Sequence, residues 1–134
     1  MVSSTTTSLA ELGNIAFGGG GQKFAVISVA ADEDSAALVA ALTKTVDAVV
    51  VAKGKIRVLA VVATQAANAG GSMYFESGST ALTGDMKAIA TSNQIVMPFN
   101  PAGWFETASG EALNLTTAGT GVYGCLVYEE VAGT

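Results

Sequence analysis

The stretch Met97–Val131, MPFNPAGWFETASGEALNLTTAGTGVYGCLVYEEV, decides how this 134-residue chain folds. It contains a strand end, a Pro/Gly turn with the only Trp, an alternating segment, a Gly-rich turn and a last apolar segment. Short apolar segments separated by Pro, Gly and Asn are typical of antiparallel strands joined by turns. No residue in the stretch resembles a reaction centre, so it indicates a packing role.

The closing segment of this stretch predicts a strand that is apolar on both faces. Its two faces are Val122, Gly124, Leu126 and Tyr128 against Tyr123, Cys125 and Val127. The segment 56–64 divides in the same way, into Ile56, Val58, Ala60 and Val62 against Arg57, Leu59, Val61 and Ala63. A sandwich strand with one face in water should alternate apolar and polar residues. Both segments therefore predict one face in the core and the other under a neighbouring subunit.

Further short strand signals precede this stretch, at 24–29, 46–52, 56–64, 73–76 and 94–99. Lys53-Gly54-Lys55 between two β-branched runs predicts a tight hairpin connection. The segment 35–45 fits either a short helix or a strand, because Leu38 and Leu42 have helical spacing. Together these signals predict an all-β fold, an antiparallel jelly-roll-like β-sandwich with room for one short helix.

The first 22 residues differ from the rest in composition. Ser3–Ser8 is rich in hydroxyl groups, and Gly18–Gly21 is an unbroken glycine tract that is costly to order. We expect residues 1–22 to form a flexible N-terminal arm with a glycine hinge, and residues 23–134 to form the sandwich domain. The arm is either a disordered tail or a segment that docks its apolar side chains on a neighbouring subunit.

The composition favours association with other proteins. Half of the residues are hydrophobic and 13% are charged, whereas average chains carry about 25% charged residues. The net charge of -5 argues against a nucleic-acid partner. The sequence has no apolar run of membrane-spanning length and no secretory leader, so we expect no membrane partner and synthesis in the cytoplasm.

The sequence offers little that supports catalysis. Histidine, the commonest general base and metal ligand, is absent. Gly119–Gly124 matches a dinucleotide-binding motif in letters only, because it opens a strand and not a helix. Cys125 lies between apolar neighbours and is expected to be a small buried hydrophobe. We expect no catalytic, cofactor-binding or metal-binding residue, no cofactor, and no enzyme activity.

Three features leave a choice between a structural and a chemical role. Asp32, Glu33 and Asp34 form either a solvated turn or a weak calcium site, and the turn is favoured. Glu106 and Glu111 have little to suggest a catalytic pair. The pair Trp104–Phe105 either plugs one end of the sandwich or forms an exposed contact with a sugar ring or a protein.

Several motifs together give the chain a family resemblance. They are Lys55–Leu59, Ser77–Gly84, Val96–Phe105, Gly110–Leu115 and the closing strand Val122–Val131. In these motifs the chain resembles small virion structural proteins of tailed bacteriophages, of the capsid decoration (cement) type. The resemblance covers residues 46–131, and neither the region 32–45 nor the arm contributes to it.

The resemblance implies a jelly-roll sandwich that assembles as a homotrimer and stabilises the lattice of the major capsid protein. It places the protein on the outer surface of the capsid. The alternative is a trimeric fibre, spike or receptor-binding module that binds carbohydrate, with Trp104 and Tyr74 as stacking platforms. The residues that we expect at interfaces are Leu9, Leu12, Ile15, Phe17, Leu59, Val61, Trp104, Phe105, Tyr123 and Val127.

Overall fold

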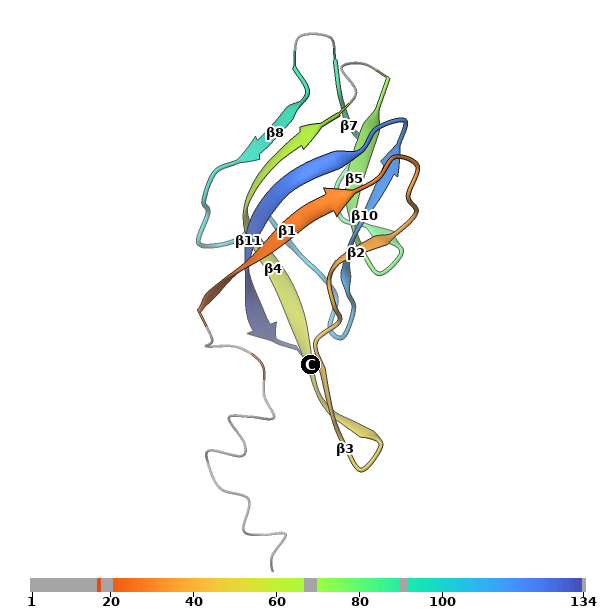
Figure 1. Ribbon diagram of the computed structural model, residues 1–134. Coiled ribbons are helices and arrows are strands. Elements are labelled where there is room, and N and C mark those ends of the chain that lie inside the picture. Colours follow the sequence, from red (N-terminus) through yellow and green to blue (C-terminus); the bar gives the residue numbers. More distant parts are fainter. Residues whose placement is uncertain (1–16, 18–20, 67–69, 90–91, 134) are drawn as a thin grey trace, which may run out of the picture.

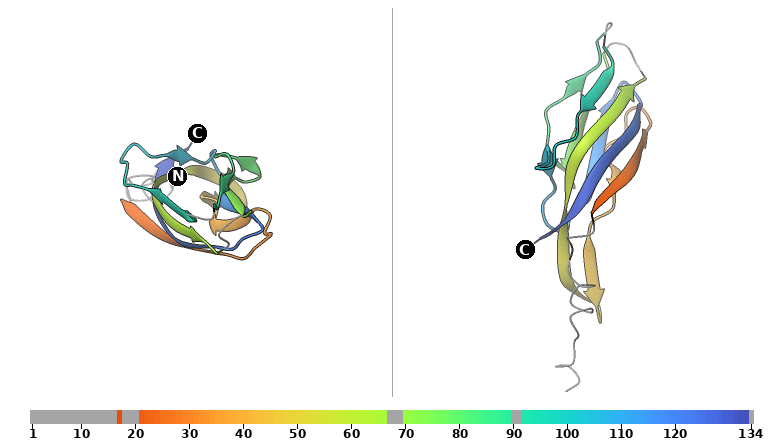
Figure 2. Two further views of the ribbon diagram at one scale, coloured as in Figure 1. Left: turned by 90° about the horizontal axis from the view of Figure 1, so that it is seen from above. Right: turned by 90° about the vertical axis from the view of Figure 1, so that its left-hand side faces the viewer.

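The computed structural model describes residues 17, 21–66, 70–89 and 92–133 (Figure 1). Within these residues the chain forms eleven β-strands and no helix. The strands form two antiparallel sheets that lie as two layers around one interior (Figure 2), which confirms the predicted β-sandwich. The predicted arm lies mostly outside the described residues.

The two sheets differ in size. The six strands of sheet A are β1 (Gln22–Val29), β3 (Thr43–Val46), β4 (Val49–Gln65), β8 (Gln94–Met97), β9 (Phe105–Glu106) and β11 (Val122–Ala132). The five strands of sheet B are β2 (Ala36–Val39), β5 (Ser72–Ser77), β6 (Thr80–Ala81), β7 (Met86–Lys87) and β10 (Leu113–Ala118).

The order of the strands is that of a jelly roll. Sheet A runs β1-β11-β4-β8 and sheet B runs β2-β10-β5-β7. The first strand thus pairs with the last, β2 with β10, β4 with β8 and β5 with β7. Nested antiparallel pairs of this kind, divided between two sheets, define the jelly-roll architecture.

The core lies between the sheets and is almost entirely apolar. Its largest fully buried side chains include Phe75, Ile27, Ile56, Met73, Leu113, Leu115 and Leu126. The ring of Phe105 packs on that of Phe75 with 5.1 Å between their centroids. Phe105 therefore packs against the core as the aromatic plug of the sandwich, whereas its neighbour Trp104 is exposed.

A β-bulge changes which side chains of β4 face outward. Ladder partners run from Val127↔Ala60 directly to Tyr128↔Val58, so Leu59 has no partner on β11. Below the bulge Ile56 and Val58 are buried, and above it Val61 and Ala63 take over the inward side. Sequence alternation placed Leu59 and Val61 on the outer face, and this prediction was wrong. Both are buried, with exposed fractions of 1% and 0%.

The ambiguous segment 35–45 contains no helix. It forms strand β2, which pairs with β10, and the start of β3, which pairs with β4. The helical spacing of Leu38 and Leu42 is overridden because both elements complete a sheet, and both leucines still pack against the core.

The hairpin turn lies six residues before the predicted position. Strand β4 runs unbroken through Lys53-Gly54-Lys55, and the turn is formed by Asp47 and Ala48, with φ angles of 51° and 65°. Two residues with positive φ between paired Val46 and Val49 match the type I′ turn that suits strand twist. Gly54 serves packing instead, since a Cβ there would lie 2.8 Å from the ring of Phe17.

Replacing Gly124 with alanine tests the tight central ladder. A Cβ at this position would lie 2.0 Å from the carbonyl oxygen of Val62 and 2.7 Å from Ala63 Cα. We expect Gly124→Ala to lower the free energy of unfolding by about 3 kcal/mol, measured by urea denaturation. The matched control is Gly84→Ala, because nothing lies within 4 Å of its added Cβ. Equal effects of the two substitutions would contradict the close approach of β11 to β4.

Candidate protein interface

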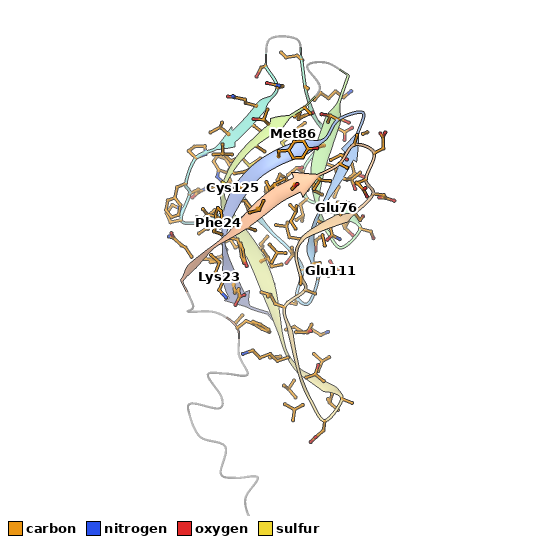
Figure 3. The ribbon with its side chains drawn as sticks, viewed as in Figure 1. Lys23, Phe24, Glu76, Met86, Glu111 and Cys125 are labelled. Atoms are coloured by element: carbon orange, nitrogen blue, oxygen red, sulfur yellow. The ribbon has the colours of Figure 1, made fainter. Side chains whose placement is uncertain are left out.

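The outer face of sheet A is apolar across four strands. The ladders align Val26, Cys125, Val62 and Val96 in one row, on β1, β11, β4 and β8 respectively. The neighbouring row contains Phe24, Val127 and Ala60. Figure 3 shows Phe24 and Cys125 on β1 and β11, which run side by side across the front of the molecule. We call these two rows together with Tyr123 the sheet A face.

Its side chains are open to solvent in the single chain. The exposed fractions are 64% for Phe24, 63% for Val26, 55% for Val62, 60% for Val96 and 49% for Tyr123. Their exposed area is on the order of 600 Å², the upper limit of the largest apolar patch on an ordinary monomer and near the 800 Å² per partner of a specific interface. This face is therefore the candidate surface for a protein contact.

Polar rows border the sheet A face at both ends. Toward the hairpin, Glu129, Arg57 and Glu106 are aligned across β11, β4 and β9. Arg57 donates to Glu106 Oε2 at 3.1 Å and to Glu129 Oε1 at 3.0 Å. These hydrogen bonds, that of Glu106 foremost, raise the pKa of the Arg57 guanidinium, so it stays cationic. The border at the other end is a row of neutral polar residues, Ser28, Thr64 and Gln94.

The outer face of sheet B is polar, in contrast to sheet A. Its outward residues include Tyr74, Glu76, Asn114 and Thr116, while Phe75 and Leu115 between them point into the core. Glu76 (Figure 3) accepts hydrogen bonds from Ser35 Oγ at 3.0 Å and from Thr116 Oγ1 at 2.5 Å. Sheet B therefore follows the alternation expected of a sheet with one face in water, and sheet A departs from it.

The structure sorts the interface residues that the sequence predicted. Tyr123 and Val127 lie on the sheet A face, and Trp104 is exposed at its charged border. Leu59, Val61 and Phe105 belong to the interior. Phe17 is half-buried, with Lys44 Nζ 5.1 Å from its ring centroid. Leu9, Leu12 and Ile15 lie outside the described residues.

The sequence reasoning missed Phe24, Val26, Val62 and Val96. Phe24, Val26 and Ser28 alternate with Ala25, Ile27 and Val29 in the sequence, and this period of two was the available signal. The sequence analysis placed Leu59 and Val61 at interfaces, on the face opposite to Val62, because the bulge at Leu59 was not foreseen. The outward direction of the Val62 side chain depends on the pairing of β4 with β11, which the sequence pattern does not contain.

Trp104 lines a shallow depression beside the charged border. Its lining residues are Arg57, Ala102, Gly103, Trp104, Phe105 and Glu106, around a volume of about 260 Å³. The indole Nε1 donates to the Pro98 carbonyl at 2.8 Å, which holds the ring in place while 46% of the residue stays exposed. An aromatic surface beside a guanidinium and a carboxylate is suited to a sugar ring. Tyr74 belongs to the opposite sheet and cannot act together with Trp104.

The candidate chemical groups have structural partners. Asp32 accepts from the Gly119 backbone at 2.8 Å, and Glu111 accepts from Ser77 Oγ at 2.5 Å, whereas Glu106 pairs with Arg57. Gly119–Gly121 form the turn that leads into β11. Within the described part of the chain, no cluster of three or more Cys, Asp or Glu residues could hold a metal ion. The same residues contain no helix long and apolar enough to cross a membrane.

No protein-family model matches this chain, and neither a curated protein nor a solved structure matches it.

The neighbouring valines Val61 and Val62 provide a test of the sheet A face. We expect Val61→Ala to lower the free energy of unfolding by about 2 kcal/mol at every protein concentration, because it leaves a cavity in the core. In dilute protein, Val62→Ala should change it by less than about 0.5 kcal/mol. The Val62→Ala loss should grow with concentration as neighbouring chains cover the face. Urea denaturation at low and high concentration measures both, and equal losses in dilute protein would contradict the outward direction of Val62.

Proposed function

We propose that this protein is a structural subunit of a tailed-bacteriophage virion, a capsid decoration (cement) protein without enzyme activity. In this proposal it assembles as a homotrimer and binds the lattice of the major capsid protein on the outer surface of the capsid. It needs no cofactor, and its partners are copies of itself and the capsid protein.

The observation that carries the proposal is the sheet A face. A monomeric enzyme or carrier of this size would keep the outer face of its larger sheet polar, as this chain does on sheet B. Jelly rolls occur in viral capsid proteins and in lectins, but the fold alone does not determine function. The apolar face favours the first of these roles, since it suits a broad contact with another protein surface.

The mechanism is burial of apolar area repeated over a symmetric lattice. At about 25 cal/mol per Å², covering the sheet A face contributes on the order of 15 kcal/mol. Association costs about 4–15 kcal/mol in lost motional freedom. One contact is therefore marginal. Several contacts held by a trimer on a repeating lattice become strong, because later contacts form at high effective concentration.

Removing part of the predicted arm tests the lattice role. Residues 1–16 can be deleted while Phe17 is kept at its packing position beside Lys44. We expect the shortened protein to keep its thermal midpoint and its oligomer mass, and to lose binding to phage capsids stripped of this protein, measured by co-sedimentation. The full-length chain is the control. If the full-length chain fails to sediment with capsids, the decoration role is refuted, and unchanged binding of the shortened chain refutes the role of the arm alone.

The depression at Trp104 supports a second candidate function, a carbohydrate-binding module of a phage fibre or spike. In this alternative Trp104 stacks on a sugar ring, and Arg57 and Glu106 bind its hydroxyl groups. We expect Trp104→Ala to reduce binding to bacterial surface glycans at least tenfold, measured on immobilised glycans. Tyr74→Ala, on the opposite sheet, serves as the control and should leave binding unchanged. Absence of glycan binding by the unmodified protein would refute this candidate.

A further inference from the structure

Strands β3 and β4 form a hairpin that projects beyond the sandwich. The residues of β4 before Gly54 pair only with β3 among the described strands, since the ladder with β11 begins at Gly54. Figure 1 shows this hairpin at the bottom of the molecule, where it continues sheet A beyond the body of the sandwich. The hairpin is therefore a separate surface, at one end of the long axis.

The projecting hairpin is apolar where it meets solvent. The exposed fractions are 49% for Val46, 61% for Val49, 47% for Val50 and 43% for Val51. Val46 and Val49 pair next to the turn on one side, and Val50 pairs with Thr45 on the other. Valine favours strands, yet a solvated hairpin tip is ordinarily polar. Four exposed valines at one tip indicate that another surface covers them.

The base of the hairpin holds it in a defined direction. Gly54 N donates to Leu42 O at 2.8 Å, and Gly133 N donates to Lys53 O at 2.9 Å. Gly110 N donates to Gly54 O at 2.9 Å. These bonds tie the hairpin to the C-terminal strand and to the loop before β10. The two-residue turn at its tip is tight and leaves no flexible loop between β3 and β4.

We propose that the valine tip of one chain docks on the sheet A face of a second copy, in a head-to-tail contact. The hairpin points away from its own sheet A face, so the two apolar surfaces of one chain cannot cover each other. A face-to-face dimer would bury the sheet A face and leave the valine tip in water. The head-to-tail contact covers the valine tip and part of the sheet A face. Contacts of this type generate rings when they close, and a closed ring of three is the homotrimer of the proposed function, on which this inference rests.

The areas are compatible with this contact. The valine tip exposes on the order of 300 Å² of apolar surface and covers a similar area of the sheet A face, so one junction buries on the order of 600 Å² of apolar area, in the range of weak, transient contacts. A single junction of this size is weak. A closed ring uses both surfaces of every chain, so all its junctions must break together before a subunit leaves.

The test uses two variants that each remove one half of the contact. The face variant carries Val26→Asp and Val62→Asp, and the hairpin variant carries Val49→Asp and Val50→Asp. All four side chains are exposed, so each variant should keep the fold, checked by circular dichroism and thermal unfolding. Ile89→Asp is the matched control, because Ile89 is 55% exposed and lies on neither surface.

We expect the unmodified protein and the control to form a closed oligomer, and each variant alone to be a monomer, measured by native mass spectrometry and sedimentation. A mixture of the two variants should form a 1:1 heterodimer, because the intact hairpin of the face variant binds the intact face of the hairpin variant. The heterodimer can be trapped with a bis-maleimide between Cys125 of the hairpin variant, which lies on its intact face, and an added Val51→Cys in the face variant.

Three results would overturn the inference. The first is a hairpin variant that keeps the oligomer mass of the unmodified protein, as a face-to-face dimer would. The second is a mixture of the two variants that gives no cross-linked heterodimer at high protein concentration. The third is an unmodified chain that stays monomeric at high concentration. Capsid co-sedimentation distinguishes failure of the head-to-tail contact from failure of the proposed function. If the two variants form the heterodimer but the unmodified protein does not bind capsids, the head-to-tail contact stands and the decoration role is refuted. If the unmodified protein binds capsids but the two variants form no heterodimer, only the head-to-tail contact is refuted.

Discussion

The ladder between β4 and β11 is the interaction on which the rest of the structure depends. It joins the longest strand of sheet A to the closing strand over eleven residue pairs and lies in the middle of the sheet. Gly124 permits the close approach of the two backbones. The bulge at Leu59 then divides the ladder into two parts with opposite orientation of β4. Below it the outward residue is charged Arg57, and above it the outward residues are Ala60 and Val62.

This ladder explains why the outer surface of sheet A is sorted into rows. Ion pairs lie on one side of the bulge, and a continuous apolar face lies on the other, extended by β1 and β8. Sheet B has no comparable apolar face, because hydroxyl and carboxylate groups occupy its outward positions. Its carboxylate Glu76 is buried with hydroxyl donors from two segments distant in sequence. The two sheets of one sandwich thus differ in the chemistry of their outer faces, which is polar on sheet B and apolar on sheet A.

The hairpin and the sheet A face also place the apolar surfaces at separate positions on the molecule. An apolar patch confined to one place favours a pair of chains related by a twofold axis, in which the same patch meets itself. Two separate patches favour an asymmetric junction that repeats from chain to chain. The protein has the second arrangement. The low content of charged residues, 13%, agrees with the proposed junctions, since the core of a protein interface is depleted in charged residues.

The sequence by itself determined the fold class, most of the strands and the apolar character of both faces of two strands. Segments such as 73–76 and 94–99 were readable because local turn residues and β-branched runs act over a few positions. Tertiary structure alone decided three points. Leu59 lies in the interior because the ladder with β11 skips it at a bulge. The segment 35–45 forms strand because it pairs with β10 and β4. The hairpin turns at Asp47–Ala48, where Val46 pairs with Val49, and β4 continues through Gly54 into its ladder with β11. Each point depends on contacts between distant segments, and a local pattern contains no information about those contacts.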